Sequence, residues 1–296
     1  MTICDALASP VAPLTVPFSR VIVVVLDGLR PDAIERCGLH HLRALCANGP
    51  STMLGTTVSP SVTAAAMTSL FTGVHPEAHG VRSDRFHIPS GAERLLPVPK
   101  VLADAGIPTF TYIRELPLLM RPLGNAIARR LGVTRASFKG KSAPMVLVEA
   151  REAFRTMSRG LFVLHWGDAD QAGHQYGWMS AEYADAAKKM DASLGLLATL
   201  TGVASDPSTL LIALADHGGG GVELTNHESD HPLDRTIPIV LSSGALRRGA
   251  LPSTAHLVDV PATILYALGV AIPESYAGRP FVEALAPAVS AYAIAS

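Results

Sequence analysis

Four apolar runs of strand length constrain the fold of this chain more than any other feature of its sequence. Each run is rich in β-branched and aliphatic residues and ends in a glycine or a polar cluster. Continuous apolar runs of this kind are typical of strands that are buried on both faces of a parallel sheet. The four runs are RVIVVVLDG (20–28), GLFVLHWGD (160–168), TLLIALADHG (209–218) and PIVLSSG (238–244).

Segments with helical periodicity lie between these runs. Their apolar residues recur at helical spacing and the segments end near glycine, which predicts helices. Strands that alternate with helices favour an α/β fold: an open, doubly wound and mostly parallel sheet flanked by helices. The predicted helices cover residues 31–49, 60–73, 180–200 and 259–269.

The length of 296 residues fits either one large α/β domain with an insertion or two domains. Residues from about 82 to 158 differ from the rest, because they mix a strand-like TFTYI with a basic segment. They predict either core elements with a solvated face or a small inserted cap over the site. We expect a single domain over residues 1–296 with this segment as its candidate cap. The basic residues are Arg121, Arg129, Arg130, Arg135, Lys139 and Lys141.

Charge and composition exclude several classes of protein. The chain has 24 basic and 25 acidic residues, so no long-range field draws it to duplex nucleic acid or to an anionic membrane. Its 48% of hydrophobic residues indicate a globular protein. Three cysteines without CxxC spacing argue against a disulfide framework. The first residues lack the apolar core of a signal peptide, and no apolar run reaches membrane-spanning length, so we expect a cytoplasmic protein.

Acidic residues and histidines follow the apolar runs. The carboxyl ends of strands in an open α/β sheet meet at one edge, where ligands bind. An aspartate at such a position would serve equally well as a helix N-cap. The joint occurrence of carboxylates and imidazoles instead predicts a Zn²⁺ or Mn²⁺ site. The residues concerned are Asp27, Asp168, Asp170, Asp216, His217, His227 and His231.

Residues 56–80, TTVSPSVTAAAMTSLFTGVHPEAHG, place hydroxyl groups directly before small residues that begin a helix. The N-terminus of a helix offers free N–H groups and a favourable dipole to a phosphate. A hydroxyl at that position, activated by a metal ion, can act as a nucleophile. The segment taken alone is equally consistent with an ordinary helix cap.

Together these motifs resemble the alkaline phosphatase superfamily, and within it the type I phosphodiesterase/nucleotide pyrophosphatase branch. VVVLDGLRPD resembles the strand with the first metal ligand, PSVTAAAMTSLFTGVHPEAHG the nucleophile helix, and DQAGHQYG the central Asp and His pair. ADHG resembles the adjacent Asp–His pair, NHESDHPLDRTIPIVL the segment of the last histidine, and HLVDVPATILYALGVAIPESYAGRP the C-terminal helix and loop. The resemblance implies a single alkaline-phosphatase-like catalytic domain.

The resemblance also implies a role for each matching residue. Thr63 is the nucleophile, because it stands at the family's spacing before Thr72 of TGVHPEAHG, and Ser61 and Ser59 are the alternatives. One metal would bind the Thr63 oxygen, and the second would lie beside it. The implied ligands are Asp27, Asp216 and His217 for the first metal, and Asp170, His174 and His227 for the second.

Two of these ligands are chosen over a neighbour. Asp170 is preferred to Asp168 because the family's D-x-x-G-H spacing fits DQAGH. His227 is preferred to His231 because HESD aligns with the family's H-G-x-D, although Glu228 replaces the glycine. The other histidines are placed outside the metal set: His75 and His79 as loop supports, and His40, His41, His87, His165 and His256 as surface or satisfied side chains.

The implied activity is metal-dependent hydrolysis of a small phosphoester, of the phosphodiesterase/nucleotide pyrophosphatase type and with nucleotide-derived compounds as candidates. Two ions, Zn²⁺ or Mn²⁺, roughly 4 Å apart would clamp the attacking and leaving oxygens while Thr63 becomes a phosphothreonine. Ala66 replaces an asparagine that is common in the family, so phosphomonoesters and phosphonates stay open as substrates. A non-catalytic relative that binds a metal or a nucleotide is the other alternative. Candidate phosphate contacts are Arg82, Arg85, Arg114 and Arg121.

Overall fold

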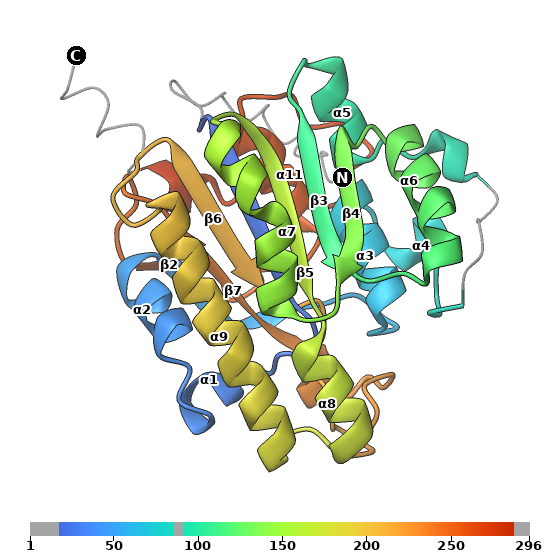
Figure 1. Cartoon of the computed structure of the whole chain (residues 1–296), viewed down its shortest axis with the longest axis vertical. Coiled ribbons are helices and arrows are strands. Elements are labelled where there is room, and N and C mark those ends of the chain that lie inside the picture. Colours follow the sequence, from blue (N-terminus) through green and yellow to red (C-terminus); the bar gives the residue numbers. More distant parts are fainter. Residues whose placement is uncertain (1–17, 86–90, 287–296) are drawn as a thin grey trace, which may run out of the picture.

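The computed structural model describes residues 18–85 and 91–286, which form one helix-flanked sheet of eight strands (Figure 1). The strand order is β4-β3-β5-β1-β6-β7-β2-β8. Parallel pairs join β4, β3, β5, β1 and β6, whereas β7 runs antiparallel to both of its neighbours. The predicted mostly parallel α/β sheet is therefore confirmed. The strands are β1 (Arg20–Leu26), β2 (Pro50–Thr56), β3 (Thr109–Arg114), β4 (Arg135–Gly140), β5 (Gly160–Trp166), β6 (Thr209–Leu214), β7 (Thr236–Ser242) and β8 (Gly249–Ala250).

Helices cover both faces of this sheet, with α7 and α9 in front of it and α3 and α11 behind it in the view of Figure 1. Helix α9 packs against α2, α7 and α8, while α3, α5 and α11 pack against one another. The helices are α1 (Ala33–Arg36), α2 (His40–Asn48), α3 (Thr63–Thr72), α4 (Pro76–His79), α5 (Val98–Asp104), α6 (Arg121–Arg130), α7 (Ala143–Thr156), α8 (Asp168–Tyr176), α9 (Ala181–Thr201), α10 (Pro232–Arg235) and α11 (Asp259–Ala267), with short 3₁₀ turns at Ala92–Arg94 and Leu118–Met120.

The central strands β1, β5 and β6 are buried almost along their whole length. Helices on both faces remove their aliphatic side chains from water, which stabilises the fold by about 25 cal/mol per Å² of buried apolar surface. Val25 of β1 lies in register with His165 of β5 and with Leu214 of β6. The three strands therefore end at the same edge, and the residues that follow them are brought together there.

Some elements differ from the sequence-based expectation. The predicted helix over residues 31–49 is divided into α1 and α2, because Gly38 adopts a left-handed φ of +69° between them. The predicted strand at 238–244 is β7, and it is antiparallel. Strands β2, β4 and β8 were not predicted. They lie toward the edges of the sheet, where exposed residues break the apolar pattern.

The described part of the candidate cap segment extends the main sheet through β3 and β4 and covers it with α5 and α7. Helix α6 packs on β4 around a small second apolar cluster of Ala128, Val133 and Phe138. His87 lies outside the described residues. Coverage of the site by this segment stays a prediction. Within the described ranges, no helix is long and apolar enough to cross a bilayer.

Candidate metal centre

All seven predicted site residues meet at the carboxyl edge of the central strands. They come from separate parts of the chain, because each parallel strand delivers the residue that follows it to the same place. Their positions are Asp27 after β1, Thr63 at the first residue of α3, Asp170 and His174 on α8, Asp216 and His217 after β6, and His227 in the loop before α10.

The first group of side chains consists of Asp27, Asp216 and His217, which are almost fully buried. Nε2 of His217 lies 3.2 Å from Oδ1 of Asp27 and 3.7 Å from Oδ2 of Asp216. Neither of these two carboxylate oxygens makes a hydrogen bond. Buried carboxylate oxygens without a donor are costly unless a cation or another charged partner lies beside them. The geometry fits a divalent cation with oxygen and nitrogen ligands.

Thr63 lies beside this group, with its Oγ1 atom 3.1 Å from Nε2 of His217. The two alternative hydroxyls are engaged elsewhere. Ser61 donates to the backbone carbonyl of His227, and Ser59 donates to the carboxylate of Asp230. Thr63 therefore has the hydroxyl that best fits the predicted nucleophile.

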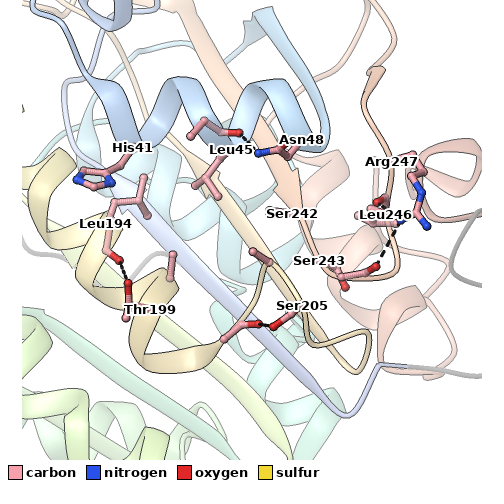
Figure 2. A pocket seen from close by; sticks show the side chains of 16 residues that line it. His41, Leu45, Asn48, Leu194, Thr199, Ser205, Ser242, Ser243, Leu246 and Arg247 are labelled. Carbon is pink, nitrogen blue, oxygen red and sulfur yellow. Dashed lines mark hydrogen bonds between the residues drawn. The ribbon is translucent and has the colours of Figure 1, made fainter.

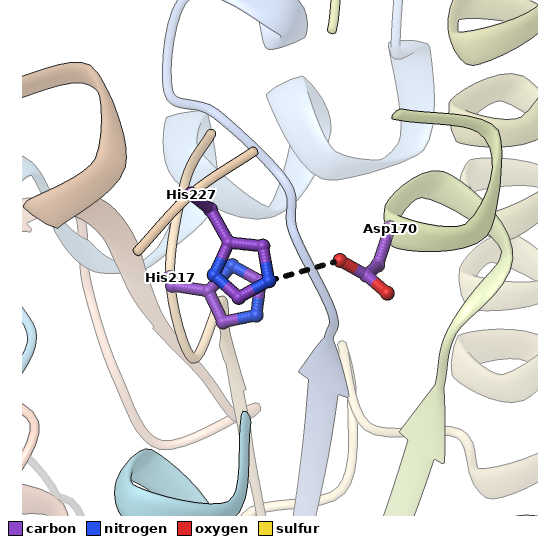
Figure 3. Close-up of side chains that lie close together, drawn as sticks. All are labelled: Asp170, His217 and His227. Atoms are coloured by element: carbon purple, nitrogen blue, oxygen red, sulfur yellow. Dashed lines mark ion pairs between the residues drawn. The ribbon is translucent and has the colours of Figure 1, made fainter. Parts of the chain in front are cut away.

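The second group consists of Asp170, His174 and His227. Oδ1 of Asp170 lies 3.3 Å from Nε2 of His174 and 3.8 Å from Nε2 of His227. The same oxygen makes no hydrogen bond. Figure 3 shows Asp170 facing the stacked rings of His217 and His227, whose centroids are 3.8 Å apart. Asp170, His217 and His227 also form a compact candidate set for one metal ion, so His217 lies between the two groups.

Three histidines of the centre are oriented in the same way. Nδ1 of His174 donates to the carbonyl of Thr225 over 2.9 Å, and Nδ1 of His217 donates to the carbonyl of Gly218 over 2.9 Å. Nδ1 of His227 donates to the carbonyl of Ser61 over 2.6 Å. A carbonyl oxygen only accepts, so each Nδ1 carries the proton and each Nε2 is turned toward the carboxylates. This is how metal-binding imidazoles are usually held.

Burial and neighbouring charges shift the pKa values of the ionisable side chains in the centre. Burial raises the pKa of Asp27 well above its ordinary value, and the neighbouring carboxylates of Asp170 and Asp216 raise it further. Burial by itself lowers the pKa of His217, but Asp216 and Asp27 outweigh it and raise this pKa well above its ordinary value. A proton on His217 therefore supplies positive charge that a divalent cation would otherwise provide. Metal binding should release protons from this edge of the sheet.

The expectation that His165 is a surface or satisfied side chain was wrong, because it is a buried neighbour of the centre whose Nε2 atom makes no hydrogen bond. It lies on β5 and is buried, with Nε2 3.4 Å from Oδ2 of Asp27. Burial lowers its pKa. The sequence does place it inside an apolar run, one residue before the strand ends, and a histidine at such a position is expected to be buried.

The neighbouring residues that were not predicted as ligands make other contacts. Asp168 accepts a hydrogen bond from the amide of Ala143 at the start of α7. His231 accepts one from the amide of Leu233 and caps α10. His79, the last residue of α4, contacts the hydroxyl of Ser69 on α3. Three of the four candidate phosphate-binding arginines have these partners: Arg82 pairs with Glu77, Arg114 donates to Gln171, and Arg121 donates to the carbonyl of Leu116.

A cavity of about 740 Å³ lies at the opposite edge of the sheet, between the ends of α2, α9 and β7 (Figure 2). Two of its polar side chains are bound to nearby backbone: Asn48 donates to the carbonyl of Ala44, and Thr199 to that of Gly195. None of the buried side-chain atoms without a hydrogen bond belongs to its lining. The carboxylate oxygens of Asp27, Asp170 and Asp216 that make no hydrogen bond lie at the carboxyl edge instead.

Several solved structures share this alkaline-phosphatase-like fold. Murine ectonucleotide pyrophosphatase/phosphodiesterase 5, an inactive form in complex with AMP, aligns at a TM-score of 0.65 and 15% identity over 87% of this chain and 97% of that one. A phosphonate monoester hydrolase from Silicibacter pomeroyi aligns at 0.64 and 14% identity over 88% and 75%. A mutant of the alkaline phosphatase PafA aligns at 0.66 and 13% identity over 90% and 99%.

The sequence profile of the type I phosphodiesterase/nucleotide pyrophosphatase family matches residues 21–103 and 125–256. These ranges contain all seven residues of the centre. The chain belongs to the type I phosphodiesterase/nucleotide pyrophosphatase family, and this membership indicates phosphoester hydrolase activity. No curated protein matches the chain significantly.

Proposed function

We propose that this protein is a phosphodiesterase or nucleotide pyrophosphatase that works with two divalent metal ions, Zn²⁺ or Mn²⁺. The observation that carries the proposal is the common orientation of three histidines. Each donates Nδ1–H to a backbone carbonyl and turns Nε2 toward carboxylate oxygens that make no hydrogen bond. Such a set of nitrogen and oxygen ligands suits zinc or manganese.

The first ion would be held by Asp27, Asp216 and His217, together with the Thr63 oxygen. The second would be held by Asp170, His174 and His227. When bound, these ions would supply Lewis-acid stabilisation of the attacking and leaving oxygens. The compact set that joins His217 to Asp170 and His227 supports two adjacent positions, because one imidazole lies close to both groups.

Thr63 would be the nucleophile. Its Oγ1 atom lies at the N-terminus of α3, where the free N–H groups and the helix dipole favour a phosphoryl group. Attack forms a bond from Thr63 Oγ1 to phosphorus and breaks the bond from phosphorus to the leaving oxygen, which takes up a proton. Water then cleaves the phosphothreonine and restores the hydroxyl. The chain contributes positioning and charge complementarity to both steps.

The substrate class proposed is a small, nucleotide-derived phosphodiester, in line with the family and with the AMP bound by the murine relative. Phosphonate monoesters are the second candidate, because one protein of the same fold is a phosphonate monoester hydrolase. The hydrolysis assay below distinguishes these two substrate classes from hydrolysis of phosphomonoesters and from a non-catalytic, metal-binding role. A cytoplasmic location remains a prediction of the sequence.

The test is hydrolysis of bis-p-nitrophenyl phosphate, p-nitrophenyl phosphate and a phenylphosphonate monoester by protein stripped with a chelator and reloaded with zinc or manganese. We expect turnover only after reloading, with the diester fastest. Faster hydrolysis of the phosphomonoester or of the phosphonate would change the proposed substrate class. The Thr63→Ala variant controls for a contaminating hydrolase. Absence of metal-dependent turnover of all three compounds would contradict the proposed activity.

A further inference from the structure

A carboxylate occupies the N-terminus of the proposed nucleophile helix. After α4 the chain returns past Gly80 toward the first turn of α3, and there Asp84 accepts a hydrogen bond from the backbone amide of Ala64 over 2.8 Å. Ala64 is the second residue of α3, directly after Thr63. Its N–H is one of the donors that the helix itself leaves free and that an anion would bind.

This position belongs to the reacting centre. The Oγ1 atom of Thr63 lies 3.1 Å from His217, beside buried oxygens of Asp27 and Asp216 that make no hydrogen bond. A phosphoryl group bonded to Thr63 would bring its other oxygens to the first turn of α3. It would then share the Ala64 N–H with Asp84 or displace the carboxylate. In either case the carboxylate of Asp84 would lie next to the incoming phosphoryl group.

We propose that Asp84 selects substrates by charge, favouring phosphodiesters with one negative charge over phosphomonoesters with two. The proposal rests on the proposed function of the centre. Two divalent cations would be balanced by the carboxylates of Asp27, Asp170 and Asp216 together with that of Asp84. A dianion would then leave twice the uncompensated charge of a monoanion, and like charges a few ångströms apart repel each other even at an exposed position such as that of Asp84.

The substitution that tests this is Asp84→Asn, because the amide has the same shape, can still accept from Ala64 and lacks the charge. Asp104→Asn is the matched control. Asp104 is an exposed carboxylate at the end of α5, just before β3 begins and therefore at the opposite edge of the sheet, where it pairs with Lys100. Both variants change the net charge of the protein equally.

The first readout is the ratio of kcat/KM for bis-p-nitrophenyl phosphate to that for p-nitrophenyl phosphate. It is measured on zinc-loaded protein at about pH 8, where the monoester is a dianion. We expect Asp84→Asn to lower this ratio by about tenfold or more, and Asp104→Asn to leave it unchanged. An unchanged ratio in Asp84→Asn would overturn the proposal while leaving the proposed function intact.

The second readout is the binding of inorganic phosphate to the zinc-loaded proteins by calorimetry, which requires no turnover. The Asp84→Asn variant should bind phosphate about tenfold more tightly than the wild type. Equal dissociation constants would overturn the role of Asp84. If the wild type hydrolyses neither ester, the proposed function fails, and the phosphate measurement still decides whether Asp84 repels a dianion.

Discussion

At the level of single residues, the hydrogen bonds of each side chain determine which of its atoms remains available to bind a ligand. The Nδ1 atoms of His174, His217 and His227 are bound to backbone carbonyls, so only Nε2 is available to a ligand. The hydroxyl of Ser61 is bound to the carbonyl of His227, whereas that of Thr63 faces His217. Hydrogen bonding thus separates reactive from structural groups where residue type alone does not.

The Thr63→Ala variant tests the proposed nucleophile. Removal of the hydroxyl should lower turnover by about 10⁴-fold or more, because the neighbouring hydroxyls of Ser59 and Ser61 are engaged elsewhere. Its zinc content should stay close to that of the wild type, since the carboxylates and imidazoles remain. Turnover and zinc content of the same preparation provide the check. Wild-type hydrolysis by this variant would remove Thr63 from the mechanism.

His227 and His231 form a matched pair that tests the last predicted metal ligand. His227 is buried against Asp170, whereas His231 caps α10 through Leu233. We therefore expect His227→Ala to lower zinc affinity by about a hundredfold or more and to abolish turnover. His231→Ala should keep both and lose about 1 kcal/mol of stability with the cap. The reverse pattern in zinc titrations would exchange the two assignments.

Residue types and spacing predicted a cluster of carboxylates and imidazoles at the sheet edge, because strand-end residues of a parallel sheet converge there. The choice of the seven residues, Thr63 and His174 among them, came from the resemblance to the family. His165 and Asp84 could not be predicted in the same way. The role of His165 depends on the register of β5 against β1, and the place of Asp84 depends on how the chain returns after α4. Both are properties of the folded chain.

At the scale of elements, the turn after β1 and the start of α8 are packed so closely that only glycine fits between them. Gly28 has a φ of +69°, and a Cβ atom there would lie 2.9 Å from the Cα atom of Asp170. The backbone amide of Asp170 also donates to the carbonyl of Asp27 over 3.2 Å. This turn therefore sets the distance between the first and second groups of ligands.

The Gly28→Ala variant should cost more stability than its backbone conformation alone explains. A left-handed residue costs about 1–2 kcal/mol, and displacement of Asp170 adds to this and should weaken zinc binding by about tenfold. Gly106→Ala is the control, because Gly106 has a φ of +71° with open space around it. Urea unfolding and zinc titration compare the two. Equal losses in both variants would mean that the contact with Asp170 does not matter.

Some strands of the sheet could be predicted from the sequence, and others could not. Apolar runs identified β1, β5, β6 and β7, because burial on both faces leaves no room for polar residues. The direction of β7 could not be read from its composition, since it depends on the path that residues 215–235 take after β6. Strand β2 mixes buried and exposed residues and carries no such run.

At the scale of the whole molecule, buried neutral histidines make stability depend on pH. Burial lowers the pKa of His79 to about 4 from an ordinary 6.5, and its Nδ1 atom accepts the amide of Val81 over 3.1 Å. Between about pH 6.5 and pH 4 the unfolded chain binds a proton there that the native protein does not. The free energy of unfolding should therefore fall as the pH is lowered, by up to about 1.4 kcal/mol per pH unit for each such histidine.

His79→Gln should reduce this pH dependence by up to one proton, measured from urea unfolding of metal-free protein at a series of pH values. His40→Gln, at an exposed position on α2, is the control with which the slope of His79→Gln is compared. The comparison uses slopes, so a general loss of stability in the buried variant does not affect it. Identical slopes in all three proteins would show that His79 is protonated equally in both states.

Zinc titration of chelator-stripped protein by calorimetry tests whether one edge of the sheet holds two metal ions. We expect two ions per chain with dissociation constants below about 1 μM, accompanied by proton release, and loss of the first ion together with turnover in Asp216→Asn. No tight zinc binding by the wild type, or two ions bound unchanged by Asp216→Asn, would contradict this expectation.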